Sequence, residues 1–192
     1  MKTYKINEIF YSLQGEGNFT GWPVVFIRFS GCNRKCTVKS NGFDCDTKHE
    51  SGEQYTAYQI VDEIKKLTKD CKRIVATGGE PLLQLDEELV DLLHENNFYV
   101  HVETNGSIIP SFKDKLDWVT VSPKEKDWAL KTGQELKVVY VGQDLESYLI
   151  SNFNYYYLQP ASMGNIQETI EQVKKYPRWK MSYQPKKNLN PR

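Results

Sequence analysis

Three of the four cysteines in the chain lie within one short polar stretch, CNRKCTVKSNGFDCDT at residues 32–47. Their spacing is C-x3-C-x8-C, from Cys32, Cys36 and Cys45. Three thiolates can bind three irons of a four-iron cluster and leave the fourth iron open to another ligand, whereas a closed structural zinc site needs four protein ligands. The incomplete set of thiols therefore indicates chemistry at a vacant metal position.

Zinc is the main alternative, because His49 or Asp46 could complete a set of four ligands. Three unrelated buried thiols are a poorer explanation, because the residues between the cysteines are mostly polar. Cys71 lies apart, directly before an apolar stretch, and is interpreted as a small core residue. In a reducing compartment, closely spaced cysteines bind metal or do redox chemistry more often than they form disulfides.

A second motif, ATGGEP at residues 76–81, follows an apolar stretch typical of a buried strand. Two glycines at this place let the backbone approach a ligand closely, which side chains would obstruct. A glycine pair alone usually indicates only a turn. Its occurrence together with the three-cysteine loop makes it informative.

The elements that must position these motifs alternate between strands and helices. Apolar patterns predict strands at residues 23–30, 73–77, 99–104, 118–122, 135–141, 155–160 and 179–183. Helical periodicity predicts helices at residues 56–69, 86–97 and 165–176. In the first helix Thr56 is the expected N-cap, and Ile60, Ile64 and Leu67 share one face.

This alternation predicts an α/β fold with a largely parallel sheet. Six or so units are too few for a closed barrel of about 250 residues, so we expect an incomplete, partial TIM-type β/α barrel of about six parallel strands with helices outside. The chain lacks low-complexity segments and long linkers, so residues 1–192 are expected to form a single domain. Ligands bind at the carboxyl ends of parallel strands, so the polar residues that follow the strands should converge there.

The composition narrows the class of partner. Twenty-five basic residues balance twenty-five acidic ones, so no overall positive field is available for nucleic acid. No apolar run reaches the roughly 20 residues that span a bilayer, so no membrane partner is expected. The first residues lack the apolar core of a signal peptide, and we expect a cytoplasmic protein.

The cysteine loop and ATGGEP together resemble the radical S-adenosylmethionine superfamily. Within it, the stretch EIFYSLQGEGNFTGWPVVFIRFSGCNRKC is similar to the 7-carboxy-7-deazaguanine synthase family of queuosine and deazapurine biosynthesis. Further similarities, spread almost from end to end, are CDT at 45–47, ATGGEPLLQ at 76–84, VETNG at 102–106, SPK at 122–124, LQPAS at 158–162 and the closing MSYQPKKNL.

The resemblance implies roles for individual positions. Cys32, Cys36 and Cys45 would bind a 4Fe-4S cluster, and Thr47 would ligate Mg²⁺. The positions implied to bind S-adenosylmethionine are Asp44, Cys45, Asp46, Gly79, Ser122, Pro123, Lys124, Gln159, Pro160, Ala161 and Ser162. Those implied to bind substrate are Leu13, Gln14, Gly15, Arg28, Thr77 and Arg192. No side chain beyond these ligands is expected to be catalytic.

The resemblance also implies a reaction. The reduced cluster would cleave S-adenosylmethionine, and the resulting radical would act on 6-carboxy-5,6,7,8-tetrahydropterin to give 7-carboxy-7-deazaguanine with loss of ammonia. Implied partners are an electron donor such as flavodoxin or ferredoxin and a second copy of the chain in a homodimer. The alternatives are a glycyl-radical activating enzyme and a zinc-binding module without catalysis.

Several of these positions have a plainer interpretation. Arg28 could bind a pterin carboxylate or form an ion pair with an acidic side chain. Lys124 could bind an anionic group or be exposed, and Glu103 could bind polar groups or form a core ion pair. The second cysteine gap departs from the superfamily pattern: eight residues separate Cys36 from Cys45, and the aromatic Phe43 lies one place earlier than usual.

Overall fold

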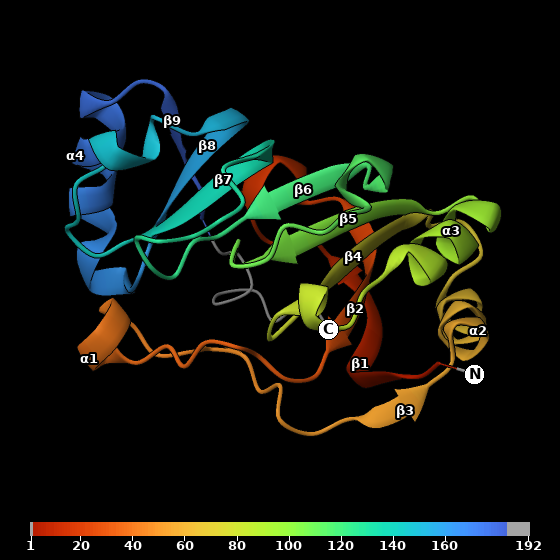
Figure 1. The fold of residues 1–192 in the computed structure, drawn as a ribbon. Coiled ribbons are helices and arrows are strands. Elements are labelled where there is room, and N and C mark those ends of the chain that lie inside the picture. Colours follow the sequence, from red (N-terminus) through yellow and green to blue (C-terminus); the bar gives the residue numbers. More distant parts are fainter. Residues whose placement is uncertain (1, 184–192) are drawn as a thin grey trace.

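The computed structural model describes residues 2–183, and an open sheet of nine strands forms its centre (Figure 1). The strands lie in the order β3-β1-β2-β4-β5-β6-β7-β8-β9. Their bounds are Tyr4–Leu13 (β1), Pro23–Phe29 (β2), Glu53–Tyr55 (β3), Arg73–Gly78 (β4), Tyr99–Thr104 (β5), Trp118–Val121 (β6), Thr132–Tyr140 (β7), Asn152–Pro160 (β8) and Trp179–Met181 (β9). All seven predicted strands are present, and they are parallel to one another as an incomplete barrel requires.

Two strands that were not predicted extend one edge of the sheet. β1 pairs antiparallel with β2 on one side and with β3 on the other. Buried Tyr4 and Ile6 begin a regular alternation along β1, but a bulge between Ile6 and Glu8 shifts the register. The bulge interrupts the period of two that identifies a strand in sequence.

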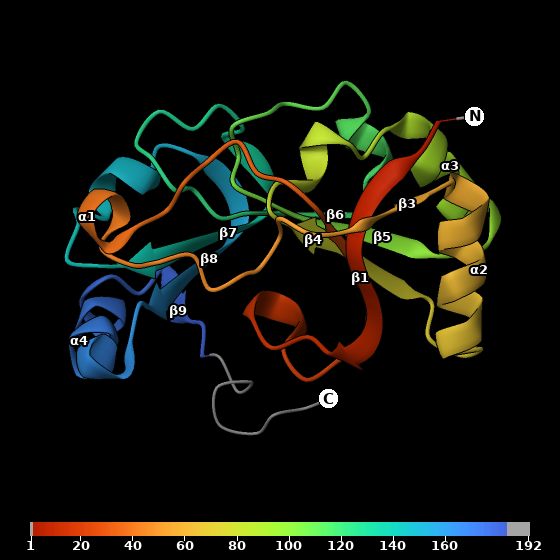
Figure 2. The ribbon, with the colours of Figure 1, turned by 90° about the horizontal axis from the view of Figure 1, so that it is seen from below.

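Helices cover the outside of the sheet at both of its ends (Figures 1 and 2). The three predicted helices are Ala57–Leu67 (α2), Glu87–Glu95 (α3) and Ile166–Lys175 (α4), and a short unpredicted helix is Val38–Asn41 (α1). α2 and α3 pack together beside β1 and β5, whereas α4 packs on β8 and β9. Short 3-10 helices are Gly17–Phe19, Pro81–Leu83, Lys113–Lys115, Glu146–Tyr148 and Met163–Asn165. No helix within residues 2–183 is long and apolar enough to cross a membrane.

Helix α2 begins as its sequence predicts and ends differently. The Thr56 side chain accepts a hydrogen bond from the Gln59 backbone, and the Gln59 side chain accepts one from the Thr56 backbone. Ile60 and Ile64 on the predicted face are fully buried, whereas Leu67 is 41% exposed. Leu67 is the last residue of the helix, and the chain turns into extended backbone at the next residue.

The connection between β1 and β2 folds back against the sheet through Phe19. The ring of Phe19 lies 4.6 Å from that of Trp118 and 5.7 Å from that of His101, measured between ring centroids. The Arg73 guanidinium lies 4.1 Å from the Phe19 ring centroid, close enough for a cation–π interaction. These contacts hold residues 14–22 against β4, β5 and β6, so the LQGEG motif becomes part of the site below.

Candidate active site

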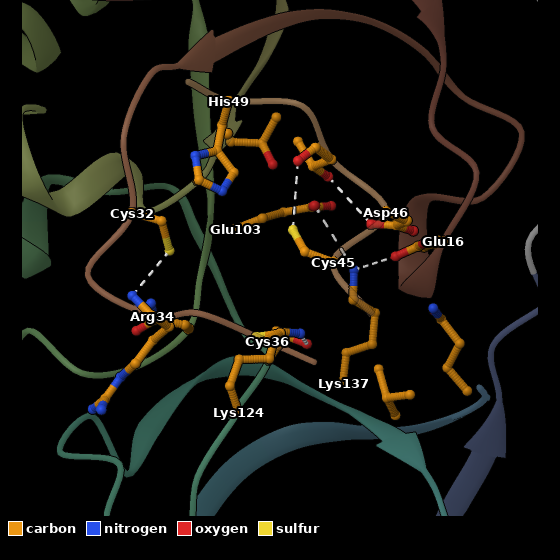
Figure 3. Close-up of a pocket in the computed structure, with 18 of the residues that line it drawn as sticks. Glu16, Cys32, Arg34, Cys36, Cys45, Asp46, His49, Glu103, Lys124 and Lys137 are labelled. Carbon is orange, nitrogen blue, oxygen red and sulfur yellow. Dashed lines mark hydrogen bonds and ion pairs between the residues drawn. The ribbon is translucent and has the colours of Figure 1, made fainter. Parts of the chain in front are cut away.

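A cavity of about 540 Å³ lies where the parallel strands end, with the cysteine loop along one side (Figure 3). Its volume falls within the range of about 300–1,000 Å³ that is typical of small-molecule sites. Most residues singled out from the sequence line it: Gln14, Gly15, Arg28, Cys32, Cys36, Asp44, Cys45, Asp46, Thr47, Thr77, Gly79, Ser122, Lys124, Gln159, Pro160 and Ala161. The expected convergence of polar groups at the carboxyl ends of the strands is therefore present.

Four predicted positions are not among the lining residues. Leu13 has a side chain that is 45% exposed, and Pro123 is buried beside the cavity. Ser162 begins a 3-10 helix, where its hydroxyl accepts a hydrogen bond from the Gly164 backbone at 3.2 Å. Arg192 lies outside the described residues. A ligand role for these four stays a prediction.

The three thiols of the cysteine loop all line the cavity. Cys32 and Cys36 are half-buried, and burial raises the pKa of both thiols. The Arg34 backbone donates to Sγ of Cys32 at 3.4 Å. Among residues 2–183, no group of three or more His, Cys, Asp or Glu side chains is close enough to hold one metal ion. Thiolates that bind separate irons of a cluster do not have to converge on one ion.

The long gap between Cys36 and Cys45 folds into an ordered bridge. Helix α1 starts at the N-cap Thr37, and its C-cap Gly42 has φ 79°, in the left-handed region that glycine adopts without a steric penalty. The Asn41 side chain donates to the backbone oxygen of Lys124 at 2.6 Å, so the bridge is tied to the loop after β6. Phe43 then lines the cavity, with its ring centroid 5.6 Å from Nζ of Lys124.

The glycine pair at the end of β4 allows the backbone to touch the cysteine loop. A Cβ atom on Gly79 would lie 2.0 Å from the backbone oxygen of Gly31 and 2.8 Å from Cβ of Cys32. Two backbone hydrogen bonds fix this approach, from Gly79 to Phe29 at 3.2 Å and from Glu80 to Gly31 at 3.0 Å. The motif therefore packs directly against the segment that presents the first thiol.

Glu80, the last acid of the GGE motif, is completely buried behind the cavity. Its carboxylate accepts hydrogen bonds from the Thr104 hydroxyl and the Asn105 backbone, both at 2.7 Å, and from the Leu82 backbone at 3.1 Å. Burial raises the pKa of Glu80, and these three donors oppose that effect. The Asn105 side chain in turn donates to Asn33 at 2.9 Å, so Glu80 links the end of β5 to the cysteine loop.

Arg28 combines the two interpretations that its sequence position allowed. Its Nε donates to Oε1 of Glu8 at 2.7 Å, so the ion pair with an acidic residue exists. The same side chain lines the cavity, and in the sheet register Arg28 lies beside Thr77, another lining residue. A guanidinium has five N–H donors, so binding Glu8 does not use up its capacity.

Lys124 lies at the SPK motif after β6 and is not simply an exposed lysine. Its side chain is partly buried, and Nζ donates to the Ser122 hydroxyl at 2.8 Å. Burial lowers the pKa of Lys124, with the positive charge of Lys137 as the next cause. Across the cavity, the Gln159 side chain accepts a hydrogen bond from Ser182 at 3.3 Å.

A polar group at the floor of the cavity contains residues that the sequence did not single out. Gln14 donates from Nε2 to Oε1 of Glu103 at 2.8 Å, and its own Oε1 accepts from the Glu16 backbone at 3.2 Å. Lys137 forms an ion pair with Glu16 and also lines the cavity (Figure 3). Lys137 was missed because a lysine within ELKVVYV is typical of an exposed position in a strand.

The residues present fit the groups that the cysteine loop indicates. Three thiols face one cavity, and the glycine pair gives close backbone approach beside the first of them. Arg28, Lys124 and Lys137 supply cations for carboxylate groups of a ligand, and Glu16 and Glu103 supply acceptors for N–H groups. This donor set suits an iron–sulfur cluster together with organic ligands that carry both amine and carboxylate groups.

Comparison with known proteins agrees with this chemistry. The family described as the radical SAM superfamily matches residues 26–126. A 7-carboxy-7-deazaguanine synthase of Bacteroides thetaiotaomicron is 45% identical over 97% of this chain and 97% of that protein. A 7-carboxy-7-deazaguanine synthase of Burkholderia multivorans is 35% identical over 98% of this chain and 99% of that protein. The crystal structure of QueE from Escherichia coli aligns with a TM-score of 0.73 at 27% identity, over 95% of this chain and 94% of that chain.

Proposed function

We propose a reaction on the premise that the chain belongs to the radical S-adenosylmethionine superfamily and, within it, to the 7-carboxy-7-deazaguanine synthases. In this reaction the enzyme converts 6-carboxy-5,6,7,8-tetrahydropterin to 7-carboxy-7-deazaguanine with loss of ammonia. The observation that carries this proposal is the single cavity that joins the three thiols to an amide, two carboxylates and an arginine. The similarity to 7-carboxy-7-deazaguanine synthases over nearly the whole chain argues against a glycyl-radical activating enzyme, and the radical SAM match argues against a zinc-binding module.

The 4Fe-4S cluster and S-adenosylmethionine are the cofactors of this enzyme, and we assign the cluster to Cys32, Cys36 and Cys45. When bound, the cluster supplies the electron that cleaves S-adenosylmethionine. The protein supports this chemistry by placing the ligands and excluding water. The part of the cavity that we assign to S-adenosylmethionine is lined by Gly79, Lys124 and the residues at the end of β8, which are Gln159, Pro160 and Ala161. In this arrangement Phe43, carried by the α1 bridge, is the aromatic neighbour of the cofactor.

The opposite part of the cavity is proposed to bind the pterin. Gln14 and Gly15 lie on the β1–β2 connection, and Arg28 and Thr77 lie on neighbouring strands. The amide of Gln14 can both donate and accept, which suits the amide and amine edge of a pterin ring. Arg28 can bind the substrate carboxylate through charge-assisted hydrogen bonds. We further propose Mg²⁺ near Thr47, because Mg²⁺ needs few protein ligands when substrate and water supply the rest.

The wider setting of the enzyme is also proposed. One sheet with one main hydrophobic cluster supports a single domain over residues 1–192. An oxygen-sensitive cluster held by free thiols requires a reducing compartment, which supports a cytoplasmic location. The electron would come from a donor such as flavodoxin or ferredoxin, and the active unit would be a homodimer.

An anaerobic assay tests this function. Protein purified without oxygen should be brown and contain about four irons per chain with matching sulfide. With a reductant, S-adenosylmethionine and 6-carboxy-5,6,7,8-tetrahydropterin, it should release 7-carboxy-7-deazaguanine, identified by mass and absorbance. Colourless protein without iron would end the proposal. Cleavage of S-adenosylmethionine without any change in the pterin would refute the substrate assignment.

A further inference from the structure

Four residues at the cavity floor, Gln14, Glu16, Glu103 and Lys137, form a closed ring. Nζ of Lys137 forms an ion pair with Oε2 of Glu16 and lies 3.8 Å from Oε2 of Glu103. Glu103 accepts from the Gln14 amide at 2.8 Å, and Gln14 accepts from the Glu16 backbone at 3.2 Å. Lys137 is the one cation of this ring, and it holds together residues from the β1–β2 connection, β5 and β7 (Figure 3).

The burial of Lys137 makes these ion pairs necessary. Its side chain is 6% exposed, compared with 22% for Glu16 and 19% for Glu103. A lysine buried without partners would lose its proton, because burial penalises the charged form. Here the two carboxylates, together with buried Glu135, outweigh that penalty and raise the pKa of Lys137 above its ordinary value. Lys137 therefore keeps its charge inside the protein.

The ring also depends on Lys137 for the geometry of its two acids. Two carboxylates at one site repel each other, and a cation between them removes the repulsion and keeps both ionised. Glu16 lies on a connection that contains Gly15 and Gly17, where the backbone has little stiffness of its own. The ion pair to the rigid strand β7 thus fixes a side chain that would otherwise have several rotamers.

We infer that Lys137 is a positioning residue for substrate recognition: it holds the Glu16 and Glu103 carboxylates at the cavity floor, where they accept hydrogen bonds from the N–H groups of the pterin ring. The amine and ring N–H of a pterin form a pair of adjacent donors, which a carboxylate can accept in a bidentate manner. This inference rests on the proposed function, because it takes the pterin as the ligand. Lys137 acts through the two acids and does not itself have to touch the substrate.

The test compares Lys137→Met in two backgrounds. Methionine keeps the length of the side chain and removes its charge. We expect the dissociation constant of 6-carboxypterin, an oxidised and unreactive analogue, to rise about tenfold or more, and the KM of the substrate to rise similarly, with kcat lowered less than about threefold. In a Glu16→Gln/Glu103→Gln background, adding Lys137→Met should change the affinity by less than about twofold. Lys137→Arg, which keeps the charge, should restore most of the affinity.

Matched controls separate this effect from a loss of structure. Lys115 also contacts two carboxylates, Glu87 at 2.8 Å and Asp91 at 2.7 Å, but it lies on the outer surface. Lys115→Met should leave the analogue affinity unchanged, and iron content and melting temperature report the folding of every variant. If Lys137→Met does not fold, Lys137→Arg with unchanged melting and a tenfold loss of affinity would overturn the inference.

The outcomes distinguish this inference from the proposed function. If the wild-type protein neither binds the analogue nor converts the pterin, both fail together. If the wild type converts the pterin and Lys137→Met binds the analogue normally, only the role of Lys137 fails. An equally large loss in the Glu16→Gln/Glu103→Gln background would also overturn it, because Lys137 would then act directly on the substrate or on the fold.

Discussion

Arg28 and Glu8 face each other across the antiparallel pair formed by β2 and β1, and Nε of Arg28 donates to Oε1 of Glu8 at 2.7 Å. Both side chains are mostly shielded, at 18% and 29% exposure. The ion pair limits the conformations of the guanidinium before any ligand binds. Four of the five N–H donors of Arg28 do not take part in this bond. Glu8 therefore orients the guanidinium and leaves it able to bind a ligand in the cavity.

The first prediction concerns Arg28. Arg28→Ala should lower kcat/KM for the pterin about 100-fold, because a charge-assisted hydrogen bond contributes about 1.5–3 kcal/mol and a bidentate pair contributes more. Reductive cleavage of S-adenosylmethionine without pterin should continue. Glu8→Gln, which only loosens the guanidinium, should cost less than Arg28→Ala. Equal loss of both reactions in Arg28→Ala would remove Arg28 from the substrate role.

The second prediction separates Cys71 from the other cysteines. Cys71 is buried, and its Sγ donates to the Pro23 backbone at 3.3 Å, away from the cavity. Cys71→Ser should therefore keep full iron content, measured chemically on anaerobic protein, whereas Cys45→Ser should lose most of it. A drop in iron of a quarter or more in Cys71→Ser would show that the assigned thiols are incomplete.

The third prediction tests the contact between the glycine motif and the cysteine loop. Gly79→Ala places a Cβ 2.0 Å from the Gly31 oxygen, so the segment that presents Cys32 must move. Because the clash is with backbone, a side-chain rotation cannot relieve it. Iron content should fall by more than about half, a sign that one ligand is displaced. Gly164→Ala is the matched control for melting temperature, because Gly164, like Gly79, lacks a positive φ and the nearest atom to a Cβ there is 3.5 Å away.

Much of the fold could be predicted because parallel strands carry a strong local signal. Ile74, Val75 and Ala76 are fully buried in β4, and such a continuous apolar run identifies a strand without any tertiary information. β1 lacks that signal, because its bulge breaks the alternation of buried and exposed side chains. β3 has only three residues, too few for any period to appear.

The candidate site divides in the same way. Cys32, Gln14 and Thr77 belong to short motifs, so their neighbourhood in the sequence identifies them. Lys137 depends on a partner 121 residues away, and no local pattern distinguishes a buried, paired lysine from an exposed one. Phe43 reaches the cavity only because α1 docks on the loop after β6, a tertiary contact that the length of the cysteine gap does not reveal.

The fourth prediction addresses this α1 bridge. Asn41→Ala removes the 2.6 Å hydrogen bond to the Lys124 backbone and frees the segment that carries Phe43. The affinity for S-adenosylmethionine, measured on reconstituted protein, should fall about three- to tenfold, equivalent to the roughly 1 kcal/mol of one hydrogen bond. Val38→Ala, which changes an exposed side chain on the same helix, is the control. If Asn41→Ala binds S-adenosylmethionine as tightly as the control variant and the wild type, the bridge does not order the part of the cavity assigned to this cofactor.

The fifth prediction is a pH dependence that comes from Glu135. Burial raises the pKa of Glu135 from 4.5 to about 7, although Lys137 and the Asn18 backbone oppose this shift. The folded state therefore binds this proton more tightly than the unfolded state. Relative to Glu135→Gln, the wild-type protein should be progressively destabilised as the pH rises from about 4.5 to about 7, by roughly 2–3 kcal/mol in total, and the difference should then level off.

Denaturant unfolding of wild type and Glu135→Gln at several pH values measures this difference directly, because ionisations common to both proteins cancel. Glutamine keeps an oxygen that can accept the 3.0 Å hydrogen bond from the Asn18 backbone, so the comparison isolates the charge. Glu95→Gln, at an exposed helix end, controls for the change in net charge. A constant difference between pH 4.5 and 7 would mean that Lys137 and the Asn18 backbone offset the burial of Glu135, so that the pKa of Glu135 is not raised in the folded protein.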